Sequence, residues 1–214
     1  MQEINNFEDD LKYKLYSNLN KIMHPSISKK NISSYKIVLK EDISLVRVFY
    51  PLKVSNLNKV IIYIHGISSV SGCGNHYSDI CMNIALKTKQ LVIAVDYDEH
   101  KRYLECLKDI AKCVKFISDE LNLLGIDNNS ITLMGDSIGA TMAYSVSKML
   151  GDIKRNILII TASNDYLKEE AYQFSEFHSC DILELTVGGH GFLKNMSLDI
   201  ENIFYIKILE FLEK

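Results

Sequence analysis

The chain has 214 residues, of which 47% are apolar and 24% charged, and it contains only ten glycines and two prolines. A chain of this length can bury a sizeable core, and the scarcity of glycine and proline leaves little room for a linker. The formal net charge of −3 gives no reason to expect a nucleic-acid partner. These features predict one globular domain.

Five scattered cysteines suggest a reducing environment: Cys73, Cys81, Cys106, Cys113 and Cys180. Their odd number, in a chain that does not need disulfides, predicts free thiols and a cytoplasmic protein. Cys73 and His76 are spaced like metal ligands, but no second pair accompanies them, so neither a metal nor a cofactor is predicted. We also expect no signal peptide and no integral membrane segment, because no apolar run is long enough to cross a bilayer.

The N-terminal region shows a helical pattern. Apolar side chains recur every three or four positions in residues 3–22, which predicts an amphipathic helix, and His24-Pro25 ends it. We assign residues 1–30 to this helical segment. Its mixed charges favour packing on the domain surface over binding to a membrane, and a third use is as a lid. Residues 31–214 are assigned to a single domain.

The rest of the chain alternates strands with helices. Residues 35–39 and 43–50 flank Glu41-Asp42 and predict an antiparallel hairpin. Apolar runs then predict buried strands at 60–64, 91–95, 131–134, 157–160 and 182–187. Helical patterns lie at 75–88, 101–123, 138–150, 167–177 and 198–213. This order predicts an α/β fold with a mainly parallel sheet of about seven strands, helices on both faces and an antiparallel N-terminal hairpin.

One short segment carries a candidate nucleophile. Gly135-Asp136-Ser137-Ile138-Gly139 joins a predicted strand to a predicted helix, which is the arrangement of a nucleophile elbow. The glycines would let strand and helix pack closely, and Ser137 would stand at a helix N-terminus that stabilises nearby negative charge. The pattern alone more often marks an ordinary turn, so partners for Ser137 are needed.

The partners should follow strands, because ligands of such sheets bind beyond the carboxyl ends of the strands. His190 follows the last predicted strand and is the candidate base, and Asp165 follows the strand at 157–160 and is the candidate acid. Asp96 also follows a strand, although its alternative role is to tie down the next loop. Asp152 and Asp181 precede strands. Surface or structural roles are expected for the other histidines: His24, His65, His76, His100 and His178.

Taken together, these motifs resemble the α/β-hydrolase superfamily, and within it the hormone-sensitive lipase-like carboxylesterases. The resemblance covers roughly residues 45–214 and rests on a series of segments: His65-Gly66, Ser71-Gly72, Val95-Asp96-Tyr97, Leu124-Gly125-Ile126-Asp127, Gly135 to Gly139, Asp165 and His190-Gly191-Phe192. It implies an α/β-hydrolase fold for residues 31–214. It also implies that Ser137, His190 and Asp165 act as nucleophile, base and orienting acid, an order that favours Asp165 over Asp96.

Residue chemistry supports the same roles, because a serine becomes a good nucleophile only when an oriented imidazole removes its proton. The oxyanion that forms needs backbone donors. Ile138 can supply one N–H, and the turn of Gly66 and Ile67 can supply another. Three further residues are assigned structural roles at the site: His65, Gly135 and Gly139.

Three departures from the family distinguish this chain. Ile67-Ser68 replaces two glycines of the family's oxyanion loop, and Asp98-Glu99-His100-Lys101 replaces the family's Arg-Leu-Ala-Pro-Glu. Ser137 and Asp165 are only 28 positions apart, which leaves room for one helix and one strand. We infer a reduced core that lacks the usual further strand, helix and cap.

The sequence therefore predicts a carboxylesterase that acts on small or carrier-presented acyl esters through an acyl-enzyme. A thioesterase, an acyltransferase or a peptidase could use the same triad, and a non-catalytic binding protein could use the same scaffold. The oligomeric state is not predicted.

Overall fold

The computed structural model describes residues 24–29, 32–38, 45–51, 59–66, 76–123, 126–151, 157–194 and 196–213. The chain divides into two compact units, Met1–Lys154 and Arg155–Lys214. Each unit has its own cluster of buried apolar side chains. The assignment of residues 31–214 to a single domain stays a prediction.

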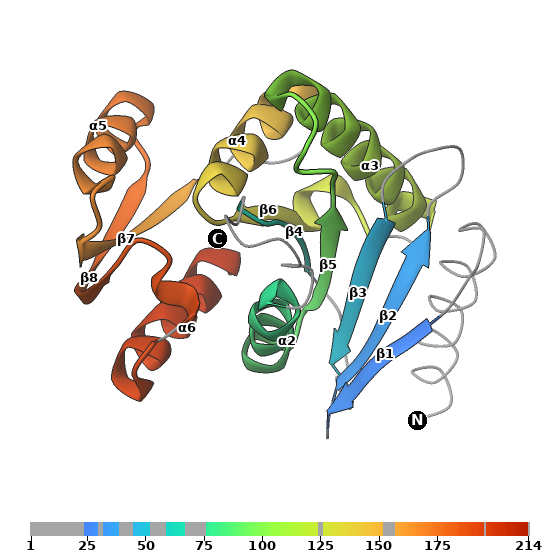
Figure 1. Ribbon diagram of the computed structural model, residues 1–214, viewed down its shortest axis with the longest axis horizontal. Coiled ribbons are helices and arrows are strands. Elements are labelled where there is room, and N and C mark those ends of the chain that lie inside the picture. The colour runs from blue at the N-terminus through green and yellow to red at the C-terminus, as the bar shows by residue number, and fades with distance from the viewer. Residues whose placement is uncertain are drawn as a thin grey trace. The chain divides into compact units, whose positions relative to one another are not determined.

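The first unit contains a six-stranded mixed sheet in the order β1-β2-β3-β5-β4-β6 (Figure 1). Its strands are β1 (His24–Lys29), β2 (Ile32–Val38), β3 (Leu45–Pro51), β4 (Val60–Ile64), β5 (Leu91–Asp96) and β6 (Ile131–Gly135). β2 and β3 pair antiparallel, which confirms the predicted hairpin, and β3 continues antiparallel onto β5. β4 lies between β5 and β6 and is parallel to both.

Two expectations were wrong, one about the number of strands in the main sheet and one about residues 24–29. The main sheet has six strands in the part of the chain that the structure describes, not about seven, because β7 (Leu158–Asn164) and β8 (Asp181–Gly189) form a separate parallel pair. Residues 24–29, assigned to the N-terminal helical segment, form strand β1. Its short polar sequence carries no strand pattern, and β1 is defined by its antiparallel pairing with β2. The predicted helix over 3–22 and its role as a lid lie outside the described residues.

Helices cover both faces of the main sheet, as predicted. They are α2 (His76–Thr88), α3 (Tyr103–Leu123) and α4 (Ile138–Leu150). Because side chains alternate along a strand, Ile62 and Ile64 join the apolar cluster that includes α3 and α4. Tyr63 points the other way, and its ring centroid lies 6.4 Å from that of Tyr77 on α2. Figure 1 shows α2 on one side of the sheet and α3 with α4 on the other.

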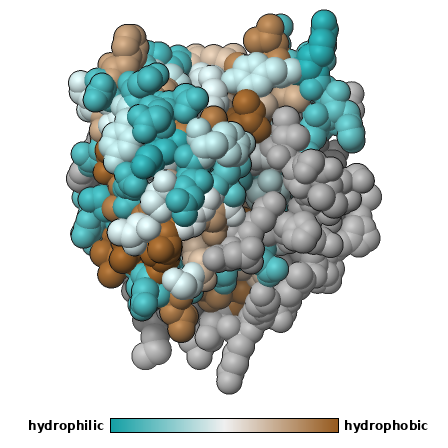
Figure 2. Space-filling view, turned by 60° about the vertical axis from the view of Figure 1, so that its left-hand side comes forward, coloured by the Kyte–Doolittle hydropathy of each residue, from teal (hydrophilic) through white to brown (hydrophobic). Residues whose placement is uncertain are grey.

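The second unit is built from β7, α5 (Lys168–His178), β8 and α6 (Leu198–Leu212). Its small core contains Ala162, Leu185 and Ile200, with Phe192 packed against them. Several large apolar side chains stay exposed on α6, namely Leu198, Ile203 and Ile206. Figure 2 shows a surface on which polar and apolar side chains are mixed. Over the described ranges, no helix has the length and apolar character needed to cross a membrane.

Two deeply buried thiols make the free energy of unfolding decrease at alkaline pH. Burial raises the pKa of Cys81 well above its ordinary value and that of Cys113 to about 12. An unfolded chain releases thiol protons near pH 8.5, so above about that pH the folded state binds more protons than the unfolded state. The free energy of unfolding is therefore retained below about pH 8.5 and falls above it, by up to about 1.4 kcal/mol per pH unit for each thiol.

Urea unfolding at about pH 7.5, 9 and 10 measures this slope. The double variant Cys81→Ala/Cys113→Ala should have a clearly smaller slope between about pH 9 and 10, because these two thiols no longer titrate. Burial also raises the pKa of Cys106 and of Cys180, so these thiols keep part of the slope in the variant. An unchanged slope in the double variant would contradict this explanation.

Candidate active site

Ser137 lies in a sharp turn between β6 and α4. Its backbone has φ 52° and ψ −128°, a conformation that is strained for a residue with a side chain. Two backbone hydrogen bonds hold the turn: the Gly139 N–H donates to Asp136 O at 2.9 Å, and the Ala140 N–H donates to Ser137 O at 3.0 Å. Ser137 is exposed and stands directly before the first residue of α4. This is the strand–turn–helix geometry that the motif predicts.

The two glycines of the motif are required by close backbone packing. A Cβ on Gly135 would lie 2.5 Å from the Gly139 carbonyl carbon, and a Cβ on Gly139 would lie 2.6 Å from the His65 carbonyl oxygen. Real Cβ atoms essentially never approach other atoms so closely, and backbone cannot move aside as a flexible side chain can. The glycines therefore let the start of α4 rest against the end of β4.

Asp165 and His190 form a hydrogen-bonded pair. Asp165 follows β7 and His190 follows β8, and these strands are parallel neighbours whose ends meet where Asn164 pairs with Gly189. His190 Nδ1 donates to Asp165 Oδ1 at 3.1 Å, and the same oxygen accepts from the Leu167 N–H at 2.9 Å. A carboxylate at Nδ1 selects the tautomer in which Nε2 carries the lone pair, as a general base requires.

The surroundings of His190 restrict its ring. The Tyr166 ring lies 4.7 Å from the imidazole, centroid to centroid, and is tilted against it by 39°. Gly188 and Gly191, on either side of the histidine in sequence, have φ values of 105° and 78°, which favour glycine. Ser137 belongs to the first unit, whereas Asp165 and His190 belong to the second.

The predicted oxyanion loop is described only as far as Gly66, since Ile67 lies outside the described residues. Gly66 packs on the elbow, because a Cβ on it would lie 3.1 Å from the Ser137 Cβ. Its N–H donates to Asp136 Oδ1 at 3.1 Å, and the same oxygen accepts from the Tyr63 hydroxyl at 2.7 Å. The Gly66 N–H is therefore engaged by a carboxylate in this structure.

His65 is buried between two tyrosine rings. The imidazole stacks on Tyr77 at 4.7 Å and on Tyr97 at 4.4 Å, and its Nδ1 lies 2.9 Å from the Gly66 carbonyl oxygen. Glu99 Oε1 lies 3.9 Å from the same nitrogen. The contacts of His65 are thus with aromatic rings, its own loop and a carboxylate, and its structural role stays a prediction.

The rival residues have other partners. Asp96 accepts from Arg47 Nε at 2.7 Å, which joins β5 to β3, and Arg47 Nη1 donates to Ser78 Oγ at 2.7 Å, which joins β3 to helix α2. The His178 ring contacts Phe174 and Phe177 at the end of α5. The side chains of His24 and His76, together with Cys73 and Asp152, lie outside the described residues.

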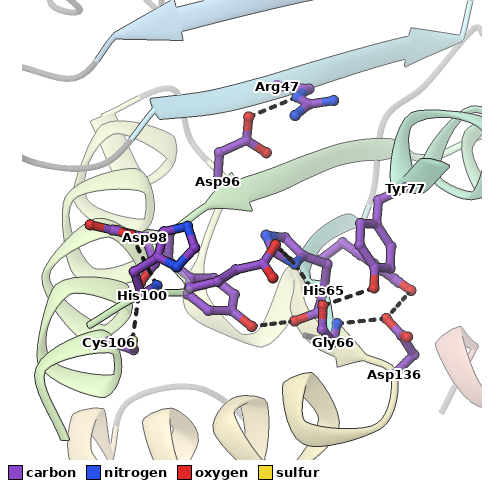
Figure 3. A network of polar contacts seen from close by, with 12 residues as sticks. Arg47, His65, Gly66, Tyr77, Asp96, Asp98, His100, Cys106 and Asp136 are labelled. Carbon is purple, nitrogen blue, oxygen red and sulfur yellow. Dashed lines mark hydrogen bonds and ion pairs between the residues drawn. The ribbon is translucent and has the colours of Figure 1, made fainter. Parts of the chain in front are cut away.

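Four polar residues at the site were not assigned a role by sequence reasoning: Tyr63, Tyr77, Tyr97 and Asp136. Figure 3 shows Tyr77 and Asp136 beside Gly66. Burial, with the nearby Asp136 carboxylate second in effect, raises the pKa of Tyr63 well above its ordinary value. Burial, with the nearby Glu99 carboxylate second, also raises the pKa of Tyr97. Both hydroxyls therefore remain proton donors at neutral pH. One signal was visible in advance, because Tyr63 is the single polar side chain in β4.

Two curated relatives share part of the sequence. The chain is 28% identical to "Arylacetamide deacetylase-like 3" of Mus musculus over 109 residues, which are 49% of this chain and 26% of that protein. It is 27% identical to "Ethyl acetate hydrolase" of Pseudomonas putida over 92 residues, which are 42% of this chain and 29% of that protein. The matched part therefore spans less than a third of either relative.

Two further comparisons concern the fold. A sequence profile for the alpha/beta hydrolase fold matches residues 61–177, which is more than half of the chain. The structure resembles the hyperthermophilic esterase from the archaeon Pyrobaculum calidifontis with a TM-score of 0.70 and 16% identity, over 99% of this chain and 90% of that chain. At this identity the likeness shows the fold alone.

The packing of the elbow generates a prediction about stability. Gly139→Ala should lower the free energy of unfolding by at least about 3 kcal/mol, because the added methyl group meets backbone. Gly151→Ala, at the other end of α4, is the matched control. Its methyl group enters open space, and its φ of 75° costs roughly 1 kcal/mol. Urea unfolding of both variants measures the difference, and equal losses would contradict the packing argument.

Proposed function

The chain belongs to the alpha/beta hydrolase fold family, and on that premise we propose that it is a serine hydrolase that cleaves carboxylic esters. The observation that carries the proposal is the strained backbone of Ser137 between β6 and α4. Such strain persists only where surrounding structure holds it, and it gathers at catalytic positions. The name of one relative, a hydrolase of ethyl acetate, supports the ester class, and the name of the other, a deacetylase-like protein, supports removal of an acyl group.

We assign the chemistry to three residues. Ser137 Oγ attacks the acyl carbonyl carbon while His190 Nε2 takes the hydroxyl proton, and Asp165 holds the imidazole through its Nδ1–H. The tetrahedral intermediate collapses, and the C–O bond to the alcohol breaks as His190 returns the proton to the leaving oxygen. Water then attacks the acyl-enzyme by the same route, which releases the acid and restores Ser137.

The oxyanion is assigned to backbone donors at the elbow and the loop. Ile138 is the first residue of α4, and the N–H groups of the first helical turn have no partner within the helix. Gly66 lies against Ser137, but its own N–H is engaged by Asp136. We therefore assign the loop contribution to the next N–H, that of Ile67, together with the N–H of Ile138, and Gly66 supplies the room for close approach.

The proposed triad is tested by labelling the purified chain with a fluorophosphonate and locating the modified residue by mass spectrometry. We expect labelling at Ser137 that is lost in Ser137→Ala and His190→Ala, with kcat/KM for 4-nitrophenyl acetate lowered by about 10⁴-fold or more. Asp165→Asn should lower kcat by about 10⁴-fold, because the tautomer of His190 is no longer selected.

Two matched variants serve as controls. His178→Ala removes a histidine that contacts aromatic rings on α5, and Asp199→Asn removes an exposed carboxylate in the first turn of α6. Both should keep kcat/KM within about twofold of the unaltered chain. A folded protein that is not labelled at all would overturn the proposal and favour a non-catalytic binding role.

The substrate is proposed to be a small ester or an acyl group presented on a carrier. Between Ser137 and Asp165 the described residues form α4 and β7, and a spacing of 28 positions leaves little room for an inserted cap. Each methylene of an acyl chain gains about 0.8 kcal/mol on burial, but only where apolar side chains surround it. A serine without a covering insertion offers few such side chains, so a long acyl chain gains little binding free energy. We expect kcat/KM for 4-nitrophenyl butyrate to exceed that for the laurate by about tenfold or more. A preference for laurate would contradict this substrate class.

A further inference from the structure

Two tyrosines from different elements hold consecutive carbonyl groups of the loop that begins at His65. The Tyr97 hydroxyl donates to His65 O at 2.7 Å, and the Tyr77 hydroxyl donates to Gly66 O at 2.8 Å. Tyr77 lies on α2 and Tyr97 follows β5, so they approach the loop from separate parts of the first unit. We call this pair the tyrosine clamp.

The clamp is rigid because its rings are buried and stacked. Tyr77 and Tyr97 are 6% and 5% exposed, and between them lies the His65 imidazole, at interplanar angles of 25° and 13°. A buried ring that stacks on a neighbouring ring has little freedom to move its hydroxyl. The positions of the two loop carbonyls are therefore set by helix α2 and by the segment after β5.

Each held carbonyl also orients an N–H, because a trans peptide group is planar and its N–H points opposite to its C=O. The peptide between His65 and Gly66 is held at both ends: Tyr97 binds its carbonyl, and Asp136 binds its N–H. The peptide that follows Gly66 has its carbonyl held by Tyr77 and by His65 Nδ1. Its N–H is the one to which we assigned the loop contribution to oxyanion binding.

The loop needs such support because strand pairing ends before it. β4 ends at Ile64, so the carbonyls of His65 and Gly66 lie beyond the sheet hydrogen bonds. A glycine-containing turn outside the sheet has conformational freedom, and a freely rotating peptide would not keep an N–H in place. Oxyanion donors accelerate a reaction only when they are oriented before the charge develops.

We propose that Tyr77 and Tyr97 are positioning residues that orient the oxyanion donors of the loop, an inference that rests on the proposed function. Neither tyrosine touches the substrate. They act through the backbone of His65 and Gly66.

The test compares three Tyr→Phe variants that each lose one hydroxyl hydrogen bond and keep the ring. Tyr77→Phe and Tyr97→Phe should each lower kcat for 4-nitrophenyl acetate by about tenfold, with KM changed by less than about twofold, because misplaced donors weaken transition-state binding. The rate constant for fluorophosphonate labelling of Ser137 should fall in parallel. Tyr172→Phe, which loses a hydrogen bond to Glu184 in the second unit, is the control and should keep kcat.

If the three hydroxyls had a purely structural role, all three Tyr→Phe variants would have a similarly lowered urea midpoint and an unchanged kcat. That result would overturn the proposal. Replacing Tyr77 with 4-aminophenylalanine restores a donor and should recover kcat to within about threefold, so the test stands even if a Phe variant fails to fold.

The two proposals fail in different ways. If the unaltered chain neither reacts with the fluorophosphonate nor cleaves esters, the hydrolase assignment fails, whereas an active chain with unaffected Tyr77→Phe and Tyr97→Phe variants refutes only the clamp.

Discussion

The start of helix α4 packs directly against the end of strand β4. Neither Gly135 nor Gly139 has room for a Cβ, and the atoms in the way belong to backbone that is part of a strand, a helix or the loop at His65. Because such backbone cannot move without breaking sheet or helix, the elbow and the loop have one fixed relation. The positive φ of Ser137 follows from this constraint, since the chain must pass from strand to helix within two residues.

Polar groups then stabilise what this packing brings together. A single oxygen, Asp136 Oδ1, accepts from the Tyr63 hydroxyl and from the Gly66 N–H, so strand β4, the loop and the elbow share one acceptor. On the neighbouring strands, the ion pair of Arg47 and Asp96 joins β3 to β5. Among the described residues, no buried side-chain nitrogen or oxygen lacks a partner, as expected where desolvation makes an unpaired group costly.

Asp165 and His190 lie together because the strands that precede them are neighbours. β7 and β8 are parallel neighbours in the second unit, so the residues that follow them emerge at the same edge. Asp165 and His190 are 25 positions apart in the chain, yet helix α5 returns the chain so that their side chains meet. Glycines with positive φ beside the histidine allow the turn that aims its ring at the carboxylate.

The amino-acid sequence by itself determined the kind and order of the elements and the residues that could do chemistry. Hydrophobic periodicity placed α2 to α6 within two residues of their ends, and the continuous apolar runs marked β4 and β5, because burial on one face or on both leaves a local pattern. The fold itself was identified correctly, since the order of the strands, the elbow and the histidine loop is a property of the chain.

Only the tertiary structure decided which segments pair. The parallel pairing of β7 with β8 and the hydroxyl contacts of Tyr63, Tyr77 and Tyr97 with Asp136 or the loop join positions far apart in sequence. Hydrogen bonds are short and directional, so their partners exist only once packing has brought distant segments together.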